Sequence, residues 1–196
     1  DKLLEASDGS VYVGQARTLW RIRPGGAPEA VLRDLFEPES LCEAPDGAIW
    51  IGLQTRILVW SDGRVRETIE RPDPTATHNI VYDCAFDAHG DYWMSAAGSG
   101  LHRYRQGRWE RMLEPGDPAH FYPTTLVRTP RGGVVVQTGE RLLWIEDAGR
   151  KATPLDFGRS ELKVLTLHTA GDQVFAAGAF GLSRYRGEDE QTAWAP

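Results

Sequence analysis

The chain has 196 residues, a length that fits one domain, and 41% of them are hydrophobic, enough to form a core. The net charge of −6 and the absence of any long basic run argue against nucleic acid as a partner, because phosphate binding needs a concentrated positive face. No run of 18 apolar residues occurs, so we expect no membrane contact within this segment.

Five similar turns divide the chain, each directly before a short apolar run. They are anchored at Gly9, Gly47, Gly90, Gly132 and Asp172, which lie 38, 43, 42 and 40 residues apart. A second apolar run follows each anchor at nearly constant distance, at 18–22, 57–60, 100–104, 141–145 and 181–185. This regularity predicts five copies of one unit, with approximate bounds 1–37, 38–78, 79–121, 122–161 and 162–196.

Each copy reads as four short strands. An inner strand, such as 2–7, 81–86 or 163–168, precedes the turn, and the second strand follows it directly. The runs at constant distance form the third strands, and the fourth strands, such as 64–69 and 108–113, alternate polar and apolar residues. Asp-Gly and His-Gly supply the left-handed backbone that a tight hairpin needs.

Four antiparallel strands in each unit of roughly 40–45 residues are typical of a β-propeller. The sequence therefore predicts a single all-β domain of five four-stranded antiparallel blades, as part of a larger ring. Each blade must stack on its neighbours to bury its apolar faces, so large side chains of the second and third strands should fill the seams. We expect this of Trp50, Trp93, Leu101 and Leu182.

The two cysteines, Cys42 and Cys84, both fall in predicted inner strands, but one residue out of register with each other. A bridge between them would need closely matched geometry between two blades. The sequence reading therefore favours two buried free thiols, and it leaves the compartment undecided.

The segment "AHGDYWMSAAGSGLHRYRQGRWERM" and the shorter "PDGAIWIGL" resemble the two-component regulator propeller repeats of bacterial membrane receptors. The fourth copy departs from the pattern, with Val135 in place of Trp and Gln137 in place of Gly. The resemblance implies a periplasmic sensor domain that precedes a transmembrane helix and a histidine kinase or diguanylate cyclase. Because the chain starts on an inner strand and ends on an outermost one, we do not expect the termini to exchange a strand.

No nucleophile elbow, paired Cys ligands or phosphate-binding glycine loop is recognisable, and we expect neither a cofactor nor a metal. Acidic residues such as Glu39, Asp83 and Asp87 are interpreted as solvated or turn-capping. His78 and His120 each lie 12 residues before their anchors, in equivalent connections between neighbouring blades. The candidate ligand-binding residues are His78, Asn79, His120, Tyr122 and Arg56.

The sequence thus predicts a non-catalytic module that recognises a ligand. The ligand could be a small polar molecule or a carbohydrate, and a neighbouring propeller or dimerisation domain of the same receptor could dock there. Two solvated loop histidines remain the simpler reading of His78 and His120. A propeller enzyme of lyase or lactonase type and a carbohydrate-binding or scaffold propeller also remain open.

Overall fold

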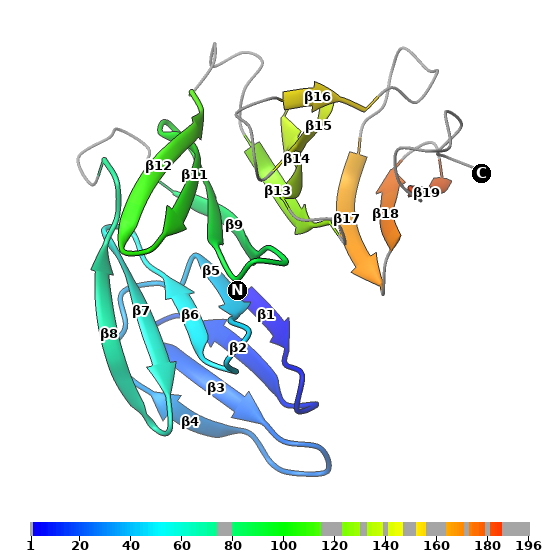
Figure 1. Ribbon diagram of the computed structural model, residues 1–196. Coiled ribbons are helices and arrows are strands. Elements are labelled where there is room, and N and C mark those ends of the chain that lie inside the picture. Colours follow the sequence, from blue (N-terminus) through cyan, green and yellow to red (C-terminus); the bar gives the residue numbers. More distant parts are fainter. Residues whose placement is uncertain are drawn as a thin grey trace.

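A computed structural model describes residues 2–73, 80–114, 123–129, 133–138, 141–146, 152–155, 164–170, 173–178 and 181–185. These residues form five antiparallel sheets, each built from strands that follow one another in the chain. The described part of the chain contains no helix that could cross a membrane. The predicted all-β architecture of five blades is confirmed (Figure 1).

Blade 1 comprises β1 (Lys2–Glu5), β2 (Val11–Gln15), β3 (Thr18–Ile22) and β4 (Glu29–Leu32). Blade 2 comprises β5 (Ser40–Glu43), β6 (Ile49–Gly52), β7 (Arg56–Ser61) and β8 (Arg64–Glu70). Blade 3 comprises β9 (Val81–Phe86), β10 (Tyr92–Ala96), β11 (Gly100–Arg105) and β12 (Arg108–Leu113). Blade 4 comprises β13 (Pro123–Arg128), β14 (Val134–Thr138), β15 (Arg141–Ile145) and β16 (Ala152–Pro154). Blade 5 contains, within the described residues, β17 (Val164–Ala170), β18 (Gln173–Gly178) and β19 (Gly181–Tyr185).

The same turn joins the first two strands in successive blades. A backbone hydrogen bond closes it at Ala6–Ser10, Ala44–Ala48, Asp87–Asp91 and Thr129–Gly133. In blades 1 to 3 the turn contains a glycine with φ between 78° and 83°, the left-handed conformation that glycine adopts without strain. An aspartate caps each of these three turns by accepting backbone N–H bonds, which confirms the turn-capping role expected of Asp87.

The blades are arranged as an arc, with the first strand of each blade on the inside (Figure 1). The inner strands pack in chain order, β1 against β5, β5 against β9, β9 against β13 and β13 against β17. One apolar cluster fills each of the four seams. The second-strand position of the repeat points into the seam with the next blade, and it is occupied by Tyr12, Trp50, Trp93 and Val135.

The predicted seam residues have three different outcomes. Trp93 and Leu101 are completely buried between blades 3 and 4, as predicted. Trp50 is partly buried between blades 2 and 3, where its ring stacks on Tyr92 with ring centroids 4.8 Å apart. The prediction for Leu182 is wrong: this side chain is exposed, because it lies on the face of blade 5 that none of the five described sheets covers.

Candidate functional site

The two ends of the sheets form two different faces of the arc. The hairpin face carries the turns between the first and second strands, at 6–10, 44–48 and 87–91. The connection face carries the loops between the second and third strands and the passages from blade to blade, such as 33–39 and 53–55. The sequence hypothesis placed the ligand on the connection face.

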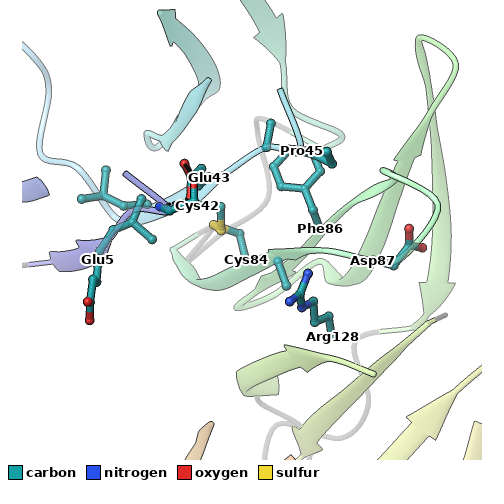
Figure 2. Close-up of a pocket in the computed structure, with 13 residues that line it drawn as sticks. Glu5, Cys42, Glu43, Pro45, Cys84, Phe86, Asp87 and Arg128 are labelled. Carbon is teal, nitrogen blue, oxygen red and sulfur yellow. Dashed lines mark hydrogen bonds between the residues drawn. A yellow bond between two sulfur atoms is a disulfide. The ribbon is translucent and has the colours of Figure 1, made fainter. Parts of the chain in front are cut away.

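A pocket of about 470 Å³ opens on the hairpin face, where the carboxyl ends of four inner strands meet (Figure 2). Blades 1 to 4 all contribute, so the pocket spans three seams. Its lining residues are Leu4, Glu5, Ser7, Leu41, Cys42, Glu43, Ala44, Pro45, Cys84, Ala85, Phe86, Asp87 and Arg128. Volumes of this size are common for small-molecule sites.

The wall of the pocket contains a disulfide between Cys42 and Cys84, which joins β5 of blade 2 to β9 of blade 3. Their Cα atoms lie 6.1 Å apart. The expectation of two free thiols is therefore wrong. Side chains alternate along a strand, so residues that meet across a seam come from opposite faces of their sheets and must be offset in the repeat. The offset of one residue between Cys42 and Cys84 in the repeat therefore places both sulfur atoms in the same seam.

Charged groups surround this apolar wall. Ser7 donates from its backbone N–H and its hydroxyl to the two carboxylate oxygens of Glu43, each at 2.7 Å, which links blade 1 to blade 2. Asp87 is buried, and its Oδ2 accepts a hydrogen bond from the Trp93 indole at 2.8 Å. Glu5 and Arg128 are exposed on the rim, in blades 1 and 4. The pocket thus offers an apolar wall between charges of opposite sign.

Arg56 is the one predicted site residue among those described, and it lies on the connection face as expected. It is exposed at the start of β7, and its carbonyl accepts a hydrogen bond from Leu53. His78, Asn79, His120 and Tyr122 lie outside the described residues, so their grouping with Arg56 stays a prediction.

The loop that presents Arg56 is supported by a buried arginine, Arg71. Its Nη1 donates to the carbonyls of Leu53 at 3.1 Å and Gln54 at 2.6 Å, and lies 3.5 Å from Oε2 of Glu39. The same oxygen of Glu39 accepts the backbone N–H of Val81 in blade 3 at 2.8 Å. Burial raises the pKa of Glu39 and lowers that of Arg71. This network ties the connection face of blade 2 to the inner strand of blade 3.

Sequence reasoning missed this network because it gave Glu39 and Asp83 solvated or turn-capping roles. Both carboxylates instead bond to the backbone of the next blade: Glu39 to Val81, and Asp83 to Leu126 at 3.0 Å. Asp83 lies within a predicted inner strand, where a charged residue must find a partner if it is buried. The position of Asp83 in a predicted inner strand was therefore the sequence signal that it has a hydrogen-bonding partner.

The remaining described histidines lie apart from Arg56. His89 occupies the turn between β9 and β10, at the opposite end of the sheets from the connection face. His102 is buried between blades 2 and 3 with Nε2 2.8 Å from the carbonyl oxygen of Ser99, and burial lowers its pKa. His168 is exposed on β17. Within the described ranges, no three His, Cys, Asp or Glu side chains are grouped as a metal ion would require.

No protein-family model and no curated protein sequence matches the chain. Solved structures do match it. Virginiamycin B lyase from Staphylococcus aureus matches with a TM-score of 0.73 and 18% identity, over 93% of this chain and 64% of the lyase. The extracellular domain of a hybrid two-component system from B. thetaiotaomicron matches with a TM-score of 0.68 and 16% identity, over 93% of this chain and 27% of that one.

A third solved structure is described as a gluconolactonase and matches with a TM-score of 0.70 and 15% identity, over 94% of this chain and 73% of that one. The chain thus spans less than two thirds of the length of the lyase. Identities of this size reflect a shared fold, and the matched proteins include both signalling domains and enzymes. The matches and the repeat geometry together identify the chain as a β-propeller.

Proposed function

We propose that the chain is an extracytoplasmic recognition module of a bacterial signalling receptor, which binds a ligand without transforming it. The disulfide between Cys42 and Cys84 is the observation that carries the proposal. Disulfides persist in oxidising compartments such as the periplasm and are rare in the cytosol. The sequence resemblance to regulator propeller repeats and the structural match to an extracellular two-component domain agree with this location.

The pocket on the hairpin face is the better described of two candidate ligand sites. Apolar groups from Leu4, Leu41 and Phe86 line it between the charges of Glu5 and Arg128. Ligand pockets commonly combine such an apolar lining with a few polar groups that fix orientation. The arrangement suits a small polar ligand, including a carbohydrate, whose apolar face packs on the wall while its polar groups reach the rim.

The connection face is the second candidate. It rests on the prediction that His78, Asn79, His120 and Tyr122 converge with Arg56. Arg71 supports the loop that presents Arg56 by donating to the carbonyls of Leu53 and Gln54. If the protein were instead an enzyme of lyase or lactonase type, two histidines on this face could act as its general acid and general base. Binding without turnover distinguishes the sensor from that enzyme.

The test is a thermal-shift screen of the chain against neutral mono- and disaccharides and amino acids, followed by calorimetry on each hit. Arg128→Ala with Glu5→Gln should abolish binding if the hairpin face holds the ligand, and His78→Ala with His120→Ala if the connection face does. Arg64→Ala, an exposed position at the start of the outer strand β8, is the control. Chemical conversion of a bound compound would contradict the non-catalytic proposal.

The location is tested separately. Protein recovered from the periplasm of an expressing bacterium should contain no thiol that reacts with an alkylating reagent before reduction. The cytosolically expressed chain should contain two. Free thiols in the periplasmic protein would contradict the assignment.

A further inference from the structure

The pocket on the hairpin face is lined at one level by a single repeat position, the last residue of each inner strand. In blades 1 to 4 this residue pairs with the first residue of the second strand, so it has the same register in each blade. Equivalent positions of a strand point to the same side, and all four side chains line the pocket. They are Glu5, Glu43, Phe86 and Arg128. The level is therefore acidic in blades 1 and 2, aromatic in blade 3 and basic in blade 4.

The charged groups of the pocket differ in how far they are already bonded. Both carboxylate oxygens of Glu43 accept hydrogen bonds from Ser7. Both oxygens of Asp87 accept hydrogen bonds within blade 3. By contrast, none of the described residues forms a hydrogen bond or ion pair with the carboxylate of Glu5 or the guanidinium of Arg128, and both side chains are exposed. One carboxylate and one guanidinium are thus left to bind a ligand.

An apolar wall separates these two charges. Glu5 lies in blade 1 and Arg128 in blade 4, and Figure 2 shows them on opposite sides of the disulfide between Cys42 and Cys84. Phe86 adds an aromatic side chain to the wall between them. A compound whose two charges sit on neighbouring carbon atoms cannot reach both groups across two blades. A matching ligand carries its charges at opposite ends of an apolar body.

We propose that this pocket binds an amphoteric ligand, with a carboxylate at one end held by Arg128 and an ammonium group at the other end held by Glu5. The planar guanidinium donates two parallel N–H bonds to a carboxylate, which suits it to this end of the ligand. The apolar body packs on Phe86 and on the disulfide. Linear ω-amino acids are the simplest members of this class. The assignment rests on the proposed recognition function and narrows its ligand from small polar compounds to this class.

The probes are ω-aminohexanoate, ω-aminooctanoate and ω-aminodecanoate, each compared with its α-amino isomer. The isomers have the same composition and charges, but the charges are adjacent. The carboxamide and the N-acetyl derivative of each ω-amino acid remove one charge at a time. Nuclear magnetic resonance titrations of the isotope-labelled chain measure the Kd of each probe. At least one ω-amino acid should bind about tenfold or more tightly than its isomer and than both derivatives, because each of these loses a hydrogen bond between charged groups.

Variants assign each end of the ligand to one side chain. Arg128→Gln should weaken binding of the ω-amino acid by about tenfold to a hundredfold and leave binding of its carboxamide unchanged. Glu5→Gln should have the same effect on the ω-amino acid and leave binding of its N-acetyl derivative unchanged. Arg64→Gln and Glu67→Gln are the matched controls, because both residues are exposed on the outer strand β8. Circular dichroism checks the fold of each variant, and the comparison of probes on the wild-type chain needs no variant.

Three results would overturn the proposal. They are α-amino isomers that bind as tightly as the ω-amino acids, capped derivatives that bind as tightly as their parents, and a chain that binds none of the ω-amino acids. A neutral compound whose binding still depends on the pocket would leave the proposed recognition function intact in each case. Chemical conversion of a bound ω-amino acid would contradict that function and leave the assignment of the two charges in place.

Discussion

The carboxylate of Asp83 in blade 3 accepts a hydrogen bond from the backbone N–H of Leu126 in blade 4, at 3.0 Å. Its other oxygen accepts the N–H of Cys84 at 2.9 Å. Glu39 makes the same kind of bond to Val81 one seam earlier. Carboxylates on an inner strand or directly before one therefore connect blades through the backbone. Burial is the main cause that raises the pKa of Asp83 to about 6.

Asp83→Asn should change how stability depends on pH. The folded protein binds a proton at Asp83 more readily than the unfolded chain, where an aspartate titrates near 3.9. Asp83 therefore favours folding most below about pH 4, and this contribution is lost as pH rises through about 6. Asparagine does not titrate, so the stability of the variant relative to wild type should increase between pH 4 and pH 7, by at most about 3 kcal/mol. Urea denaturation at both pH values measures this, and parallel pH profiles would contradict it.

Removing the disulfide should destabilise the chain. Cys42 and Cys84 are 42 residues apart, and closing a loop of that length is worth about 4 kcal/mol through the entropy of the unfolded chain. The Cys42→Ala, Cys84→Ala double variant and the reduced wild type should both show this loss in urea denaturation. Addition of a reductant should leave the double variant unchanged. Equal stability of the oxidised and reduced wild type would show that the bridge does not constrain the two blades.

The two tryptophans at equivalent repeat positions should differ in their effect. Trp93 is completely buried and donates to Asp87, so Trp93→Ala should cost about 3–5 kcal/mol. Trp50 is partly exposed, so Trp50→Ala should cost less, although its ring contacts Tyr92 and Phe86. Thermal and chemical denaturation of the two variants give the order directly. A larger loss of stability for Trp50→Ala than for Trp93→Ala would contradict this prediction.

The buried arginine on the connection face should be costly to remove. Arg71→Met leaves the carbonyls of Leu53 and Gln54 without their donor and Glu39 without its cation, a loss of about 3–5 kcal/mol for a broken buried pair. Glu39→Gln keeps an oxygen that can accept the Val81 N–H, so it should cost less. The double variant should be less destabilised than the sum of the two single changes. Additive effects in this cycle would mean that the pair is not coupled.

The repeat made much of this fold predictable. The third strands at 18–22, 141–145 and 181–185 and the inner strand at 81–86 occur with the predicted bounds, because turn chemistry and strand alternation are local properties. The same repeat could not predict that Leu182 is exposed, since its pattern is that of the buried Leu101. Whether a blade face is covered depends on the next blade, which is not a property of the unit itself.

The candidate site was less predictable than the fold. The disulfide between Cys42 and Cys84 crosses a seam between two blades. The contact of Arg71 with Glu39 joins two positions that are not equivalent in the repeat. Aligning the copies hides such pairs, because it compares residues that share a place and not residues that face each other. The pocket on the hairpin face was missed for a related reason: Glu5, Glu43 and Arg128 converge only when four blades are stacked.

The arc also determines where the molecule opens most easily. In a stacked array each unit is held mainly by its immediate neighbours, so a seam without a covalent link has a lower free energy of local opening than a cross-linked one. The pocket draws Glu5 from blade 1, which no disulfide joins to blade 2, and its other wall holds the cross-linked pair of blades 2 and 3. An occupant of the pocket would bind only the closed arrangement, so its binding energy would suppress opening of the seam between blades 1 and 2 and slow amide hydrogen exchange in β1.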